Sequence, residues 1–565
     1  MTKPTVTGES PDDAAAPLDM LLGAAALGIG RRMLPDRSWL KFGAGLIRQP
    51  RFALDRGRSL AVELTAIARG TSTRSPDRDK RFADPAWSQN PVLRRTMQTY
   101  LAAAETARAL LSDVDLEFPH SDRMRFVVDI IVDALSPTNS PLLNPLGYKA
   151  AIDTGGASVV RGTANLVREL ATPPRVPSMV EADAFTVGVT VAATPGSVVF
   201  QSEVLQLIQF TPRTPTVHTA PMLIVPPVIN KYYIVDMSPG RSMVEYFLDQ
   251  GQQVFAISWR NPKADHRAWG FDTYGQAILD AIGAVEQITG AEQTHLFAQC
   301  SGGTLATMVT AHLTDIGGAG RVAGLALAVN VLDQSKAGTV MAILDEATAD
   351  EAIRKSKARG YLDGRSLAEV FAWMRPNDLV WRYWVNNYIE GRKPQPFDVL
   401  FWNADTTRMA ATLHRDLVLC ALNNALTKPG GVQMLGTPVD LSKIAVDTYV
   451  VAGIADHISP WQSCYRSARL LSGADVSFVL SSSGHIASLV NPPGNRKASY
   501  RLGAPDSIDP QEWLNAAEKH TGSWWPNYTA WLKERSGPDR KAPTAEGNAA
   551  LPPLMPAPGS YVREK

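Results

Sequence analysis

The sequence predicts an α/β fold built around a mostly parallel sheet. From residue 222 onward, short apolar segments alternate with segments of helical period, as in MLIVPP (222–227), SMVEYFLDQG (242–251) and QVFAISWRNP (253–262). Strands that alternate with helices favour parallel pairing, with helices on both faces of the sheet. A second observation is the run THLFAQCSGG (294–303), in which an apolar strand stops and glycines open a helix.

The N-terminal part of the chain has a different character. Residues 1–18 are polar and rich in Pro and Ala, which predicts disorder. Residues 19–185 predict a mainly helical domain, in which Asn90 and Pro91 are the start signal of a long helix. The apolar run at 20–30 is too short to cross a bilayer, and a packed core helix or a surface-seeking helix would both fit it.

The predicted catalytic domain covers residues 186–536. Its first segment, SVVFQSEVLQLIQF (197–210), predicts a pair of strands. A helix over 272–290 leads to the strand before Cys300, and GLALAVNVLD (324–333) predicts the strand beyond it. This order of elements continues the α/β alternation.

The alternation stops between residues 335 and 445. This segment is helical and rich in aromatic residues, as in VFAWMRPNDLVWRYWVNNY (370–388). An insertion here predicts a cap over the strand ends, with Trp384 among the aromatic side chains that would keep the site dry. A helical subdomain that buries its own aromatic residues explains the composition equally well. The Pro-rich tail, 537–565, predicts a flexible segment.

Cys300 is the candidate nucleophile. A strand that feeds a sharp turn with a nucleophile at its apex is the nucleophile elbow of α/β-hydrolases, usually G-x-S-x-G. Here the motif begins with Ala298 instead of Gly and carries Cys in place of Ser. A thiolate is a strong nucleophile near neutral pH, and the helix that begins at Ser301 would favour the charged sulfur. A lone Cys at a strand end is also common as a small buried apolar residue.

The other members of a catalytic triad follow in the expected order. In α/β-hydrolases the chain order is nucleophile, acid and His, each in a loop after a strand. The strand at 448–452 is followed by Asp456, and the strand at 476–480 is followed by His485. Three residues in the correct order predict catalysis far more strongly than any one of them.

Two other residues compete for these roles. His457, beside Asp456, is an alternative base, and Asp405 is an alternative acid inside the predicted cap. The triplet His414–Asp416 has the letters of a kinase catalytic loop, but no Gly-rich phosphate loop accompanies it, so we interpret it as chance.

Composition limits the partners and the compartment. The chain has 565 residues, a net charge of +1 and 45% hydrophobic residues, so nothing favours nucleic acid as a partner. Three cysteines cannot form a disulfide framework, and no residues have metal-ligand spacing. The acidic residues before the first apolar run argue against a secretory signal, and free thiols fit a reducing cytosol.

Longer runs identify a family resemblance. From about 81 to 537 the chain resembles polyhydroxyalkanoate synthases, which are Cys-dependent α/β-hydrolase-fold polymerases of 3-hydroxyacyl-CoA. Its length and N-terminal helical domain are similar to those of the single-subunit synthases. The matching runs, beside the Cys box, include PPVINKYYIVDMSPGRSMVEYFLDQGQQVFAISWRNP (226–262), RYWVNNYIEGRKPQPFDVLFWNADTTR (382–408), GIADHISPWQSCYRSA (453–468), SGHIASLVNPPGN (483–495) and GSWWPNYTAWLKERSG (522–537).

The resemblance implies a reaction and a set of roles. Cys300 would carry the acyl chain, His485 would act as base, and Asp456 would orient the imidazole or help to activate the hydroxyl. We expect the backbone N–H groups of Ser301 and Val228 to bind the oxyanion. The implied partners are 3-hydroxyacyl-CoA, the growing polyester and the surface of its cytoplasmic inclusions, with no metal or redox cofactor. Whether the active species is a homodimer stays open.

Two rival functions share these features. A Cys-dependent thioesterase or polyester depolymerase would use the same triad with water as the acceptor. A granule-coating scaffold would not need Cys300 at all. The Cys nucleophile and the long matching runs favour the polymerase.

Overall fold

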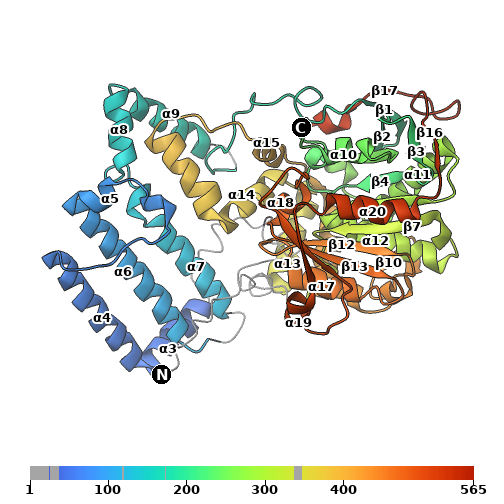
Figure 1. The fold of residues 1–565 in the computed structure, drawn as a ribbon. Helices are drawn as coiled ribbons and strands as arrows, with labels where there is room; N and C mark the ends of the chain where they lie inside the picture. The colour runs from blue at the N-terminus through green and yellow to red at the C-terminus, as the bar shows by residue number, and fades with distance from the viewer. Residues whose placement is uncertain (1–24, 26–36, 117–119, 172–173, 336–345) are drawn as a thin grey trace. The chain divides into compact units, whose positions relative to one another are not determined.

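Parallel strands form the centre of an eleven-stranded sheet, as the alternation of strands and helices predicted (Figure 1). Strands β5, β4, β6, β7, β12 and β13 lie side by side and pair in parallel, and antiparallel strands extend the sheet at both edges. In sheet order the strands are β15 (Glu518–Thr521), β14 (Ser499–Gly503), β13 (Val476–Ser481), β12 (Thr448–Gly453), β7 (Val322–Ala328), β6 (Thr294–Gln299), β4 (Met222–Val225), β5 (Val254–Trp259), β2 (Leu205–Phe210), β1 (Gly196–Gln201) and β17 (Met555–Pro556).

The helices between these strands cover both faces of the sheet. The step from β4 to β5 moves toward one edge, whereas the steps to β6 and β7 move toward the other. Right-handed crossovers in opposite directions place α10 on the face opposite to α11 and α12. The helices of this unit are α10 (Met243–Asp249), α11 (Phe271–Thr289), α12 (Cys300–Asp315), α13 (Glu346–Arg359), α15 (Asp398–Ala404), α16 (Ala411–Leu422), α17 (Trp461–Arg469), α18 (His485–Leu489), α19 (Pro510–Ala516) and α20 (Trp525–Arg535).

The reversal of strand order between β4 and β6 determines where a site can form. In an open α/β sheet, ligands bind beyond the carboxyl ends of the strands at such a reversal. The loop after β4 contains Val228, and the turn after β6 contains Cys300. Both residues therefore lie at the edge of the sheet where a catalytic site is expected.

The computed structural model describes residues 25, 37–116, 120–171, 174–335 and 346–565. The segment 1–18 and almost all of the predicted helix at 20–30 lie outside these ranges. The chain forms two compact units: Gly28–Glu181 with Arg365–Pro396, and Ala182–Gly364 with Phe397–Lys565. In the part of the chain that the structure describes, no helix is long and apolar enough to cross a membrane.

The first of these units is helical. Asn90 begins its longest helix as predicted, because the Asn90 side chain accepts the N–H groups of Val92 and Leu93 and Pro91 occupies the first helical position. The helices are α3 (Arg37–Arg48), α4 (Pro50–Arg69), α5 (Ala86–Gln89), α6 (Pro91–Asp113), α7 (His120–Ala134), α8 (Pro145–Asp153), α9 (Ala157–Ala171) and α14 (Gly364–Met374), followed by π-helical turns at Asn377–Trp381 and Trp384–Ile389.

The aromatic insertion does not form one cap. Residues 365–396 belong to the helical unit, whereas 397–445 belong to the unit of the sheet. The Trp384 indole N–H donates to the carbonyl of Asn139 at 3.0 Å, and its ring packs edge-on against Trp381 and Tyr388. The insertion therefore buries some of its aromatic residues within the helical unit, as the alternative interpretation of the sequence expected.

The prediction of a flexible tail is wrong. Residues 539–541 form β16, which pairs with β3 (Thr216–His218), and β17 adds a strand to the edge of the main sheet beside β1. Tyr561 and Val562 are buried. Composition misled the prediction because backbone pairing with a sheet edge depends on the tertiary structure, and prolines are compatible with an edge strand. The remaining short strands are β8 (Tyr361–Leu362), β9 (Met409–Ala410), β10 (Gln433–Met434) and β11 (Thr437–Pro438).

Candidate active site

Cys300 lies at a sharp turn between β6 and α12, which is the predicted strand–turn–helix arrangement. Its backbone has a φ of +48°, in the left-handed region that residues with a Cβ rarely adopt. Such a conformation costs about 1–3 kcal/mol and persists only where the surrounding structure enforces it. The residue is 6% exposed, so it is buried at the N-terminus of α12.

Small residues behind the turn make this geometry accessible. A Cβ on Gly302 would lie 2.6 Å from the carbonyl oxygen of Val225 and still closer to that of Pro226. A Cβ on Gly303 would lie 2.8 Å from the side chain of Asn330. Ala298, which replaces the usual first glycine of the motif, is fully buried in the sheet between β4 and β7.

Asp456 and His485 come together at the ends of two neighbouring parallel strands, β12 and β13. The Nδ1 atom of His485 lies 2.7 Å from Oδ2 of Asp456. The other carboxylate oxygen, Oδ1, accepts the backbone N–H groups of Ile458 and Ser459, both at 2.8 Å. These bonds hold the acid in one orientation, and it in turn holds the imidazole.

The pKa of His485 depends on both Asp456 and Cys300. Burial by itself would lower the pKa of His485, but the charge of Asp456, its hydrogen bond and a hydrogen bond to Cys300 raise the pKa to about 10. The structure thus brings the Cys300 side chain into contact with His485. Because Nδ1 of His485 faces the carboxylate, Nε2 is the ring nitrogen left for the sulfur.

Asn330 is a part of the site that the sequence analysis missed. Its amide Nδ2 donates to the carbonyl of Cys300 at 2.7 Å and to the hydroxyl of Thr304 at 3.1 Å. It follows Val329, which has a φ of +48° directly after β7. Asn330 could have been predicted from its place just after an apolar strand, because the same pattern identified Asp456.

The two predicted oxyanion donors also lie close together. The N–H of Val228 donates to the hydroxyl of Ser301 at 3.2 Å. Ser301 follows Cys300 in the first turn of α12, where backbone N–H groups lack intrahelical acceptors. The loop after β4 is therefore within one hydrogen bond of the helix that carries Cys300.

The two alternative candidates from the sequence are His457 as base and Asp405 as acid. The imidazole that hydrogen-bonds to Asp456 is that of His485, which favours His485 over its rival His457 as the base. Asp405 pairs with the ammonium of Lys565 at 2.6 Å and accepts the hydroxyl of Tyr233 at 2.9 Å. Among the described residues, no group of three or more His, Cys, Asp and Glu side chains is arranged to hold a metal ion.

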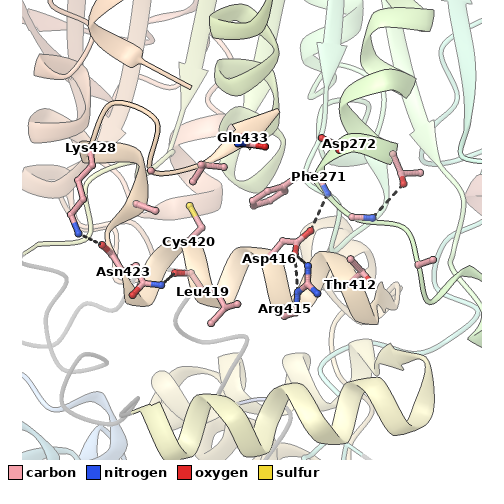
Figure 2. A pocket seen from close by; sticks show the side chains of 16 residues that line it. Phe271, Asp272, Thr412, Arg415, Asp416, Leu419, Cys420, Asn423, Lys428 and Gln433 are labelled. Carbon is pink, nitrogen blue, oxygen red and sulfur yellow. Dashed lines mark hydrogen bonds and ion pairs between the residues drawn. The ribbon is translucent and has the colours of Figure 1, made fainter. Parts of the chain in front are cut away.

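The kinase-like triplet has a structural role beside a separate pocket. This pocket has a volume of about 620 Å³ and lies between the start of α11 and α16 (Figure 2). Asp416 accepts the N–H of Phe271 at 3.2 Å and thereby caps α11, and Arg415 pairs with Asp416 (Figure 2). His414 is fully buried against the hydroxyl of Ser356. The interpretation of this triplet as a chance match agrees with these contacts.

Two family models match most of the chain. A model described as the N-terminus of poly-beta-hydroxybutyrate polymerase (PhaC) matches residues 78–247. A second, described as the alpha/beta hydrolase fold, matches residues 230–492. Together with the parallel sheet and its crossover helices, the second match confirms the predicted fold.

Relatives are similar along nearly the whole chain. Poly(3-hydroxyalkanoate) polymerase 2 of Ectopseudomonas oleovorans is 46% identical over 518 residues, which cover 91% of this chain and 92% of that protein. Polymerase 1 of the same organism is 44% identical over 520 residues, 92% of each chain. The polymerase subunit PhaC of Cupriavidus necator is 39% identical over 510 residues, 88% of this chain and 86% of that protein.

Proposed function

The chain belongs to the poly(3-hydroxyalkanoate) polymerases, enzymes that build polyester from hydroxyalkanoates, and we propose that it does so from 3-hydroxyacyl-CoA through a covalent acyl-Cys300 intermediate. The single observation that carries this mechanism is the hydrogen-bonded set of Asp456, His485 and Cys300 at the ends of adjacent strands. We propose further that the enzyme works at the surface of its insoluble product in the cytoplasm.

The first step transfers the acyl group from CoA to the enzyme. The Cys300 sulfur attacks the thioester carbonyl, and its proton passes to His485. The tetrahedral intermediate then collapses, the C–S bond to CoA breaks, and the imidazolium protonates the departing CoA sulfur. One thioester replaces another, so the acyl group stays activated for the next step.

The second step forms the ester bond. His485 removes the proton from the 3-hydroxyl of an incoming hydroxyacyl group, whose oxygen attacks the acyl-Cys300 carbonyl. The new C–O bond forms, the C–S bond breaks, and Cys300 recovers its proton from the imidazolium. Asp456 stabilises the positive charge that His485 carries in both steps.

The developing oxyanion needs donors at a fixed position. The N–H groups of Val228 and Ser301 would supply them, with the acyl oxygen replacing the Ser301 hydroxyl as acceptor for Val228. In related acyl transfer, loss of one such donor lowers kcat by about 10²–10³.

A direct assay tests this function. Purified enzyme and a Cys300→Ala variant would receive 3-hydroxybutyryl-CoA and a longer 3-hydroxyacyl-CoA in separate reactions. We expect CoA release together with rising turbidity for the wild type, and neither for the variant. CoA release without turbidity, with free 3-hydroxy acid as the product, would identify a thioesterase and refute the proposal.

A further inference from the structure

The loop that follows β4 is attached to its surroundings at three successive points. The N–H of Val228 bonds to Ser301, and Asn230 forms an isolated antiparallel bridge with Thr406. The carbonyl of Lys231 accepts the indole N–H of Trp402 at 2.7 Å. The position of the Val228 N–H therefore depends on what holds the end of this loop.

The side chain of Lys231 adds a further attachment of this loop. It is 2% exposed, and its ammonium donates to the carbonyl of Glu564 at 2.6 Å and to that of Tyr561 at 3.5 Å. Burial lowers the pKa of Lys231 to about 8, and the charge of Asp405 opposes this effect. A buried ammonium is costly unless it keeps such partners, so the loop and residues 561–564 are bound to each other.

The segment 560–565 is also bound to β2 and to residues near the edge of the sheet. Gln206 in β2 accepts the N–H groups of Ser560 and Tyr561 at 2.9 and 3.0 Å. The hydroxyl of Tyr561 donates to the carbonyl of Ser202 at 2.7 Å, and Arg260 lies 4.6 Å from the ring centroid of Tyr561. The segment thus links the edge of the sheet to the loop after β4.

We propose that Lys231 is a positioning residue, which uses the docked segment 560–565 to hold the Val228 N–H where it meets the oxyanion. This inference rests on the proposed function. Its physical basis is that an oxyanion donor works only at a fixed position, and a displacement of about 1 Å at a catalytic group costs about 10²-fold in rate. Lys231 acts through the backbone and touches no reacting atom.

Two reactions of Cys300 separate this role from a general structural one. Acylation by 3-hydroxybutyryl-CoA passes through an oxyanion, whereas alkylation by iodoacetamide does not. We expect Lys231→Met to lower the single-turnover rate of CoA release about 10–100-fold and to lower kcat with little change in KM. Alkylation of Cys300, followed on its own peptide by mass spectrometry, should stay within about twofold of wild type. Lys428→Met, at an exposed lysine, is the matched control and should change neither rate.

A second variant acts on the segment without touching the loop. Gln206→Leu removes the hydrogen bonds to Ser560 and Tyr561, so we expect the same selective loss of acylation. If Lys231→Met does not fold, this variant tests whether the docked segment positions the Val228 N–H. Acylation within about threefold of wild type in a folded variant, or a parallel fall in alkylation, would overturn the proposal. A wild-type enzyme that releases no CoA would instead refute the proposed function.

Discussion

The substitution Asp456→Asn tests the electrostatic link between the acid, the imidazole and the sulfur. The change is nearly isosteric and leaves an oxygen that can still accept the N–H groups of Ile458 and Ser459. It removes the negative charge that lies 2.7 Å from Nδ1 of His485. It also favours the wrong tautomer of His485, in which an unprotonated Nδ1 accepts a hydrogen bond from the new amide N–H and Nε2 carries the ring proton.

The expected loss of rate follows from the raised pKa of the His485 imidazole. A rise of the His485 pKa from 6.5 to about 10 corresponds to about 5 kcal/mol of preferential stabilisation of the imidazolium. Asp456 and Cys300 share this effect, and burial opposes it. The charge of Asp456 and its hydrogen bond are the largest of the contributions that raise the pKa, so the loss of both should remove about 3 kcal/mol, which is about two orders of magnitude in rate. The same change in a Ser-His-Asp triad costs about 10⁴ in kcat.

We therefore expect Asp456→Asn to slow the acylation of Cys300 by about 10²–10⁴. The assay is single-turnover release of CoA from 3-hydroxybutyryl-CoA, and alkylation by iodoacetamide at pH 7 should slow as well because fewer thiolates form. Asp475→Asn, at an exposed position before β13, is the matched control and should behave like wild type. An acylation rate for Asp456→Asn within threefold of wild type would show that the carboxylate does not act through His485.

Three further changes give independent tests. Cys300→Ser should abolish sustained polymer formation, because an oxyester dissipates the activation that the thioester keeps, and turbidity measures the loss; polymer at a near-normal rate would contradict the mechanism. Gly302→Ala should destabilise the protein by about 1–3 kcal/mol in urea unfolding, because its Cβ would meet two backbone carbonyl oxygens, whereas Gly320→Ala, with open space around it, should stay within about 0.5 kcal/mol. The pKa of His485 is raised from 6.5 to about 10 in the folded state. Protonation of His485 therefore contributes its full stabilisation below about pH 6.5, the unfolded pKa, and this contribution is lost as the pH rises through about 10. The free energy of unfolding should thus fall over this range more steeply in wild type than in His485→Gln, and equal pH profiles would refute the raised pKa.

Local features of the sequence were sufficient for the central sheet and for the three candidate catalytic residues. Buried parallel strands are continuous apolar runs, and the crossover helices between them have a helical period, so both can be recognised without tertiary information. Cys300, Asp456 and His485 lie in the turns and loops after such strands, and the carboxyl ends of parallel strands meet at one edge of the sheet. The order of these three residues along the chain was therefore enough to predict the catalytic triad.

The tertiary structure alone decided features that depend on pairs of residues far apart in the chain. Lys231 meets Glu564, and Gln206 meets Tyr561, across more than 300 residues, and no local pattern predicts such contacts. For the same reason the tail was predicted to be flexible, and the composition of the insertion could not distinguish a cap from a subdomain that buries its own aromatic residues. The composition of a segment indicates only how much apolar surface it can bury. Whether the segment pairs with a distant strand or contacts a buried charge depends on which residues the tertiary structure places beside it.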